Sequence, residues 1–414
     1  MAVRVGRLPE KVNILTVLEY LLMGLVVFYT ATWCLFTSAN CNTAIRLALP
    51  LLVVMIFLRA GVVKAAHWHR VVLLAVFLAV YLVATRYNAV RFVLYYAAPL
   101  LLLVLYVGLK ERQEGCLDLL HKLSDVVMVL TALSLFFYLF GTVLNLIPGE
   151  TTATYSWGGT VRTCPTYFHL FYEAQKINFF GLNLVRNCGV FPEAPGFAIF
   201  LVLATATEVL LRDKPRLWRC LLYVAATVTT YSAKAIVLVA AVFALKYVFT
   251  PTEGGFSRKF KAIAVPTALV GVGAVAAVLL WDKMQTVSGF MRLDDVLACF
   301  KTWLTAPVFG TGYWNDESVI PFFAYPDRYN NGLSMGVMVV LAQGGLYLLT
   351  LYAVPAVRAI LRARGQTRWM LGAFVLMMFA LLFTSNIAYN FLTLLLIALF
   401  LEYGAHGEKE PLTP

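Results

Sequence analysis

Residues 124–147 read SDVVMVLTALSLFFYLFGTVLNLI, 24 consecutive positions with a single charged side chain, Asp125. A helix of about 20 apolar residues is long enough to cross the hydrocarbon core of a bilayer, so this stretch predicts a membrane-spanning helix. Similar stretches recur along the whole 414-residue chain, in which 61% of residues are hydrophobic and 13% are charged. Such a composition leaves too little polar surface to cover a soluble domain of this size.

The pattern predicts an all-α, polytopic membrane protein in which about twelve helices form one integral domain over residues 1–414. The first predicted span follows a basic stretch, Met1–Lys11, and is too long for a cleaved signal peptide, so we expect it to be retained. The expected spans are 12–36, 44–60, 70–86, 92–109, 124–147, 192–211, 216–231, 234–250, 262–281, 332–357, 367–386 and 388–404.

Basic residues in alternate connections predict how the chain is oriented. Lysine and arginine concentrate in residues 59–69, 110–123, 212–219, 246–261 and 358–368. The positive-inside rule places these connections, and both termini, in the cytoplasm. The formal net charge of +12 then reflects topology and attraction to anionic lipid. Nucleic-acid binding is disfavoured, because no basic stripe or nucleic-acid-binding module is present.

This topology leaves two long loops on the outer face, 148–191 and 282–331. Long loops held on a rigid helical frame often carry function, although solvated lids are the alternative. The seven cysteines include no CxxC pair or Cys/His cluster, so no metal site is expected. Cys164 and Cys188 share the first loop, where they could form a disulfide in an oxidising compartment or remain thiols.

The first loop contains aromatic side chains and ends in an arginine before a proline-rich helix start. The aromatic residues could anchor the loop at the interface or stack on sugar rings. Arg186 precedes Pro192-Glu193-Ala194-Pro195, and the amides of a helix N-terminus beside an arginine favour an anion. Glu193 is a helix-start carboxylate, a general base, or a group that positions Arg186. The polar and aromatic residues of this loop are Tyr155, Trp157, Tyr167, Phe168, His169 and Tyr172.

A polar turn between two short apolar runs, Thr229-Thr230-Tyr231-Ser232-Ala233-Lys234, is expected to lie below the outer surface. A lysine at that depth is costly unless it faces a wet cavity or a counter-charge. Lys234 therefore either extends to the interface or contacts a phosphate.

The second loop carries Arg292, Asp294 and Asp295, and an amphipathic helix is predicted over residues 296–304. A Gly310-Thr-Gly312 turn follows, but no strand precedes it, so a dinucleotide site is rejected. Further polar residues lead to the next helix, which the Asn-Asn-Gly332 step opens toward the outer face. They are Asp316, Glu317, Asp327, Arg328, Asn330 and Asn331.

These motifs resemble those of the O-antigen polymerase and O-antigen ligase-like family, which includes Wzy-type polysaccharide polymerases. The resemblance covers residues 180–350 by motif and the whole chain by topology. Four steps carry it: an outer-loop arginine before a Gly-aromatic-x-Glu-x-Pro helix start, a Thr-x-Ser turn, an Arg-x-Asp followed by Pro-x-Phe-Gly-x-Gly, and a polar step into a helix with Gly-Gly-Leu. The matching residues are Arg186, Gly189, Phe191, Glu193, Pro195, Thr230, Ser232, Arg292, Asp294, Pro307, Phe309, Gly310, Gly312, Asn330, Asn331, Gly344, Gly345 and Leu346.

The resemblance implies a GT-C-like membrane glycosyltransferase that joins undecaprenyl-diphosphate-linked oligosaccharides outside the bacterial cytoplasmic membrane, without cofactor or metal. O-antigen, capsule and exopolysaccharide are the polymers that such enzymes make, and a flippase and a chain-length regulator are the implied protein partners. Arginines can stabilise the charge on the departing diphosphate. Arg186, Arg292 and Glu193 are then the expected catalytic residues. The expected substrate-binding residues are Lys234, Arg328, Asn331, Ser232, His169 and Asp294.

One departure from the family pattern concerns the acceptor chemistry. Ligases of the family carry a histidine where this chain has Asn330-Asn331, which favours a polymerase over a ligase. The general base remains open between Glu193, His169 and no dedicated base.

The main rival function is a transporter or flippase of lipid-linked oligosaccharide. Transporters concentrate polar residues at the membrane midplane, often in two matching halves. Here the polar residues concentrate in two loops, and Glu19 is the clear carboxylate within a span. A scaffold in an assembly complex is a third possibility, but it would not require arginines in the outer loops.

Overall fold

The computed structural model describes residues 13–29, 43–59, 65–111, 114–157, 160–168, 170–172, 175–179, 182–251, 287–325 and 332–406. The predicted span 262–281 lies outside these residues. The α-helices are α1 Ile14–Tyr29, α3 Thr43–Arg59, α4 Ala65–Thr85, α5 Ala89–Phe92, α6 Ala98–Glu111, α7 Asp118–Phe137, α8 Ala194–Ala206, α9 Leu217–Thr229, α10 Ala233–Phe249, α12 Val287–Thr305, α13 Gly336–Arg362, α14 Gly365–Thr384 and α15 Phe391–His406. Helical turns of other types are η1 Val93–Ala97, η2 Tyr138–Val143, η3 Thr207–Leu211, η4 Asp316–Ser318 and η5 Ile320–Phe322.

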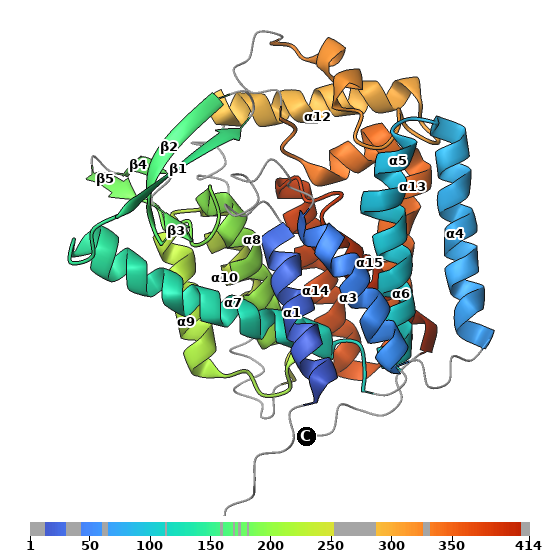
Figure 1. Ribbon diagram of the computed structural model, residues 1–414, viewed down its shortest axis with the longest axis horizontal. Helices are drawn as coiled ribbons and strands as arrows, with labels where there is room; N and C mark the ends of the chain where they lie inside the picture. Colours follow the sequence, from blue (N-terminus) through green and yellow to red (C-terminus); the bar gives the residue numbers. More distant parts are fainter. Residues whose placement is uncertain are drawn as a thin grey trace, which may run out of the picture.

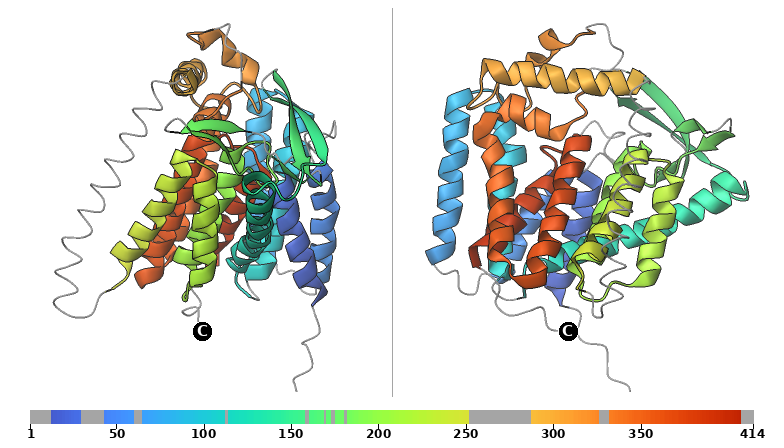
Figure 2. Two further views of the ribbon diagram at one scale, coloured as in Figure 1. Left: turned by 90° about the vertical axis from the view of Figure 1, so that its left-hand side faces the viewer. Right: turned by 180° about the vertical axis from the view of Figure 1, so that it is seen from behind.

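The helices form a bundle, with α12 lying across one end of it (Figures 1 and 2). Six helical segments in the described part of the chain are long and apolar enough to cross a bilayer: 68–85, 89–111, 118–143, 194–211, 336–362 and 365–384. Their ends lie within six residues of those of predicted spans. The prediction of a mostly helical, membrane-embedded protein is therefore confirmed at this level, while the number of spans stays a prediction.

The first predicted loop contains short strands, which the all-α expectation did not include. β1 Thr151–Trp157 pairs antiparallel with β2 Thr160–Tyr167, and β2 pairs with β3 Phe171–Tyr172. A second hairpin joins β4 Lys176–Phe179 and β5 Leu182–Val185. β-branched and aromatic residues are frequent in β1 and β2, and they favour a pleated surface, where cross-strand pairs stabilise a sheet.

The second predicted loop also differs from the expectation. The amphipathic helix α12 begins at Val287, nine residues before the predicted start. Arg292 and Asp294 consequently lie on a helix and not in a loop. A helix places each side chain at a defined angle, so α12 fixes which residues face the bundle beneath it.

Helix α13 is interrupted at Gly345, which has a φ of 62° and a ψ of −169°. The turn that follows α12 fills the break. The Thr311 and Gly312 amides donate to the carbonyls of Ala342 and Gln343, at 3.0 and 2.9 Å. In the other direction, the amides of residues 346 and 347 donate to the carbonyls of residues 307 and 308, at 3.0 and 2.8 Å. Broken helices are tolerated inside membranes only when the freed backbone groups find partners, and this turn supplies them.

Close backbone contact explains why glycines occupy this junction. A Cβ on Gly345 would lie 2.3 Å from the carbonyl oxygen of Val308, and one on Gly310 would lie 2.3 Å from the carbonyl carbon of Gln343. Both glycines also have positive φ. The Phe-Gly-x-Gly and Gly-Gly motifs are therefore two halves of one structural joint.

At the end opposite α12, a buried ion-pair network joins four helices. The Glu19 carboxylate accepts from Arg59 at 3.1 Å and from Lys110 at 3.0 Å. Lys122 also pairs with Glu19 and, at 2.7 Å, with Asp118. Glu19 is 1% exposed, and buried charge is tolerated when it is paired in this way. The basic connections predicted to share one side meet at this end, since residues 117, 212, 246 and 366 line one small cavity there.

Candidate functional site

The segment from Arg186 to Phe197 forms a tight link between β5 and α8. The Asn187 amide group donates to Thr229 Oγ1 at 3.1 Å, and its backbone amide donates to the Thr229 carbonyl at 2.9 Å. Ser134 of α7 donates to the Asn187 side-chain oxygen, which also accepts from the Gly189 amide at 3.1 Å. Asn187 is 4% exposed. It therefore fastens the segment to α7 and α9 and fixes where its neighbour Arg186 lies.

The glycine and aromatic residues of this segment set the direction in which α8 begins. Gly189 has a φ of 57°, and a Cβ there would lie 3.1 Å from the ring of Phe197. Phe191 stacks on Phe197 and on Phe200 of α8. Glu193 is the N-cap residue of α8, with its side chain making no capping hydrogen bond. Glu193 thus lies at the positive end of the α8 dipole, so both roles considered for its carboxylate, at the helix start and in chemistry, stay predictions.

Arg186 is held against the turn between α9 and α10. Its Nε donates to the Thr230 carbonyl at 2.8 Å, and its Nη1 donates to Gln175 Oε1 at 2.8 Å. The Gln175 carbonyl also accepts from the Arg186 backbone amide at 2.9 Å. Gln175 thus holds both the backbone and the guanidinium of Arg186, a role that the sequence did not indicate.

The same turn positions Lys234. Thr230 is fully buried and Ser232 is 4% exposed. Tyr231 adopts a φ of 46°, and Ser232 is the N-cap residue whose carbonyl accepts from the Ala235 and Ile236 amides at 2.9 and 3.0 Å. Ser232 therefore begins α10. Two residues later, the Lys234 ammonium donates to the Ser385 hydroxyl and, at 3.5 Å, to the Thr384 carbonyl.

Arg292 reaches the same helix end from α12. Its Nη1 donates to the Thr384 carbonyl at 3.3 Å. Thr384 is the last residue of α14, and carbonyls at a helix C-terminus carry the negative end of the helix dipole. Lys234 and Arg292 therefore converge on one backbone oxygen, from segments 150 and 92 residues away from Thr384 in the sequence.

Electrostatic coupling joins these residues into one group, which we call the cationic cluster: Arg186, Lys234, Arg292 and the carboxylate Glu193. Arg186 and Arg292 both repel the Lys234 ammonium, whereas Glu193 attracts it. The pKa of Arg186 and the pKa of Arg292 are both lowered, because burial disfavours the charged guanidinium. The negative charge of Glu193 opposes this effect in part. All four side chains are partly buried. The sequence-predicted catalytic residues are thus brought within electrostatic range of one another.

Several N–H groups of the two arginines can still donate to a further acceptor. In the described part of the chain, the hydrogen bonds of Arg186 use Nε and Nη1, and that of Arg292 uses Nη1 alone. No carboxylate among the described residues lies within ion-pair distance of Arg186, Lys234 or Arg292. A guanidinium has five N–H donors, and its fork suits two oxygens of a phosphate. Partly buried cations that repel one another are stabilised by an anion between them.

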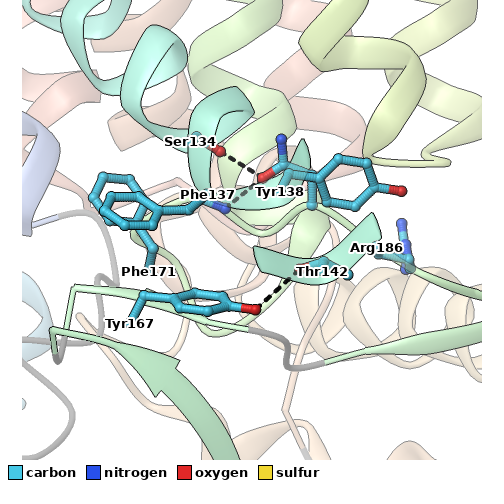
Figure 3. Close-up of a pocket in the computed structure, with 9 residues that line it drawn as sticks. Ser134, Phe137, Tyr138, Thr142, Tyr167, Phe171 and Arg186 are labelled. Atoms are coloured by element: carbon cyan, nitrogen blue, oxygen red, sulfur yellow. Dashed lines mark hydrogen bonds between the residues drawn. The ribbon is translucent and has the colours of Figure 1, made fainter. Parts of the chain in front are cut away.

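A pocket adjoins Arg186 on the side of α7 (Figure 3). Arg186 lies at one end of it, and the rings of Tyr167 and Phe171 lie at the other. Phe137 stacks on both rings, with centroids 5.6 and 5.0 Å away. Tyr167 and Phe171 are only 5% and 6% exposed. These two rings therefore pack the strands onto α7. Phe168 also contacts Phe137, edge-on with centroids 5.7 Å apart, but it is 61% exposed, so its stacking on a sugar stays a prediction.

Asp294 and Asp295 attach polar segments to α12. Asp294 Oδ1 accepts from the Ala324 amide at 2.8 Å. Asp295 Oδ2 accepts from the amide and the hydroxyl of Ser334, at 3.0 and 2.6 Å. The two carboxylates are 5% and 2% exposed. Asp294, predicted to bind substrate, has a described contact that fastens the chain before α13 to α12.

Three predicted site residues lie outside the described part of the chain: His169, Arg328 and Asn331. Asn330 is outside it as well. Besides Gln175, the structure adds two residues that the sequence interpretation missed, Thr384 and Ser385. A polar step at the end of an apolar helix was the available signal, and it resembles the Thr230 to Ser232 turn.

Among the described residues, one set of three carboxylates lies close enough together to hold a metal ion: Glu19, Glu114 and Asp118. It lies at the end opposite α12 and is already paired with cations: Lys110 contacts Glu114 at 2.7 Å and Asp118 at 2.9 Å. Cys164 and Cys188 are buried free thiols. The predicted absence of a metal in the cationic cluster stays a prediction.

Comparisons with known proteins do not assign the chain to a family. No protein-family model matches it, and no curated protein matches it significantly. The geometry of the cationic cluster is therefore the main guide to function.

Proposed function

We propose that this protein is a membrane glycosyltransferase that polymerises oligosaccharide repeat units carried on a polyprenyl diphosphate. The observation that supports it most is the convergence of Arg186, Lys234 and Arg292 on two helix ends at the α12 face of the bundle. Such a cluster fits an anionic group that several cations hold at once. A diphosphate joined to a lipid and to a sugar is an anion of this kind, and it can enter from the bilayer.

The cluster would assist the departure of the diphosphate. As the bond between the anomeric carbon and the diphosphate oxygen breaks, its electron pair leaves with the diphosphate and negative charge grows on that oxygen. Prearranged donors at the position where charge develops lower the barrier, because they need no reorganisation during the reaction. Arg186 is held by Gln175 and by the Thr230 carbonyl, so it is arranged in advance in this sense.

The acceptor is a hydroxyl group on the terminal sugar of a second lipid-linked unit. Its oxygen attacks the anomeric carbon from the face opposite the diphosphate, which inverts the configuration in a single displacement. The proton of the hydroxyl must then leave. Glu193 is the described candidate to accept it, since its carboxylate interacts electrostatically with all three cations of the cluster.

The orientation follows from charge distribution. The basic connections meet at the end opposite α12, where the positive-inside rule would place the cytoplasm. The cationic cluster would then face the extracytoplasmic side of a bacterial cytoplasmic membrane, where the lipid-linked units are exposed after their transfer across the bilayer. A carrier driven by an intramembrane carboxylate is less well supported, because Glu19 is paired with Arg59, Lys110 and Lys122.

The test is incubation of the purified full-length protein with polyprenyl-diphosphate-linked repeat units and no other substrate. We expect a ladder of longer glycans and release of polyprenyl diphosphate. Arg292→Ala should abolish the ladder. Arg91→Ala, the matched control, removes an exposed arginine that lies over Trp314 at 5.4 Å and should leave the ladder intact.

Two outcomes would contradict the proposal. Intact substrate that crosses the bilayer of a proteoliposome would indicate a transporter. Release of the carrier without a ladder would indicate a ligase that lacks its acceptor.

A further inference from the structure

A groove separates α4 from the rest of the bundle at the end opposite the cationic cluster. It encloses about 480 Å3, within the range of about 300–1,000 Å3 that is typical of ligand pockets. Its walls come from α4, α6, α13 and α15, and they are mainly apolar: Leu73, Leu74, Phe77, Val104, Leu351 and Val354. Helix α4 lies at the edge of the bundle (Figure 1), and only 17% of its membrane-length segment is buried. The groove beside it is therefore at the periphery of the bundle.

The mouth of the groove is polar and carries excess positive charge. It is formed by His69, Arg70, Arg358 and Glu402. Arg70 Nη1 contacts Glu402 Oε2 at 2.6 Å. Arg358 is exposed and has no ion-pair partner among the residues that the structure describes. Among the lining residues that the structure describes, two arginines and one glutamate give one formal net positive charge.

Aromatic packing closes the other end of the groove. Phe77 of α4 stacks on Tyr347 of α13, with ring centroids 4.2 Å apart. The Tyr347 hydroxyl donates to the Phe77 carbonyl at 3.0 Å. Seven helical residues separate Arg70 from Phe77, so the groove runs about 10 Å along α4. One leaflet of the hydrocarbon core is about 15 Å thick, so the groove spans most of one leaflet.

We propose that this groove binds one anionic phospholipid with a single negative charge, such as phosphatidylglycerol. The phosphate lies at the mouth beside Arg358 and Arg70, and one acyl chain lies along the apolar walls toward Phe77. Charge complementarity selects this occupant: a single phosphodiester matches the single excess positive charge, whereas the amine of a zwitterionic lipid would meet two guanidinium groups. Buried methylene groups supply the apolar part of the affinity. The lipid thereby fills the space between α4 and α13.

Native mass spectrometry of the full-length protein, with equal amounts of phosphatidylglycerol and phosphatidylethanolamine, tests the proposal. We expect one retained phosphatidylglycerol per chain. Arg358→Gln should weaken its binding by about fivefold, the contribution expected of one cation near an anionic headgroup. Arg362→Gln is the matched control. It lies one helical turn further along α13 outside the groove lining, and it should change binding by less than about twofold.

A second variant separates occupancy of the groove from attraction at the surface. Val354→Trp leaves every charge in place but fills the groove, so it should remove the bound lipid while the thermal unfolding temperature shows that the bundle remains folded. The assignment would be overturned if Arg362→Gln weakened phosphatidylglycerol binding as much as Arg358→Gln does. It would also be overturned if both Arg358→Gln and Val354→Trp retained the bound lipid in full. Displacement of phosphatidylglycerol by an equal amount of polyprenyl phosphate would also overturn it, because the groove would then prefer the carrier.

Discussion

Replacement of Arg186 by alanine separates the structural role of this residue from its chemical role. The variant loses two hydrogen bonds, from Nε to the Thr230 carbonyl and from Nη1 to Gln175. Each contributes about 1 kcal/mol net, so the free energy of unfolding should fall by about 2 kcal/mol. The loss of a donor that stabilises developing charge should lower the rate of chain extension by about 10²–10³-fold, or roughly 3–4 kcal/mol. The effect on rate should therefore exceed the effect on stability.

Two further substitutions test the geometry behind this estimate. Gln175→Ala keeps the charge of Arg186 but removes the group that orients it, so stability should fall by about 1 kcal/mol and the rate by up to ~10²-fold. Arg186→Lys also keeps the charge but cannot bond the Thr230 carbonyl and two phosphate oxygens together. We expect it to restore little activity.

The assay follows release of polyprenyl diphosphate and growth of the glycan ladder, with thermal unfolding measured on the same purified samples. Arg91→Ala again serves as the control for loss of one positive charge at this end of the bundle. The reasoning is refuted if Arg186→Ala remains folded and extends chains at the parent rate. A rate loss no larger than the stability loss would leave Arg186 with a purely structural role.

Three other predictions concern the proton, the broken helix and the buried ion pairs. Glu193→Gln should lower the rate of chain extension by about 10²–10⁴-fold and remove the acidic limb of the pH–rate profile, as expected of a lost general base; an unchanged limb would place the base elsewhere. Gly345→Ala should lower the unfolding temperature, because the added Cβ would lie 2.3 Å from the Val308 carbonyl oxygen, whereas Gly24→Ala, with no atom within 4 Å of its Cβ, should be neutral or stabilising by up to ~1 kcal/mol. Glu19→Ala leaves three cations without their shared carboxylate and should cost about 3–5 kcal/mol in thermal or denaturant unfolding; an unchanged unfolding temperature would show that water already reaches this network.

The helical regions could be predicted from the sequence because membrane insertion depends on local hydrophobicity. Segments such as 124–147 need only their own composition to be recognised. The strands of residues 151–185 were missed, because short pairs depend on partners across the hairpin and carry a weak periodic signal. The start of α12 at Val287 was missed for a similar reason, since polar residues near Arg292 resemble a loop until the bundle beneath them is known.

The candidate site could be predicted from the sequence only in part. Arg186, Glu193 and Arg292 could be selected because charged residues are scarce in an apolar chain and these three lie in polar segments near proline and glycine turns. Gln175 could not be selected, because a glutamine in a loop has no distinctive pattern, and Thr384 is marked only by a polar step at a helix end. Their importance comes from which side chains reach them.

By itself, the sequence determined the membrane character of this protein, the approximate position of its helices and the segments that carry its cations. These properties sum along the chain, because each residue contributes its hydrophobicity or charge wherever it lies. Only the tertiary structure decided that Lys234 and Arg292 meet at the Thr384 carbonyl, from 150 and 92 residues away. Such contacts depend on how helices pack against one another, and the packing of many side chains fixes that arrangement jointly.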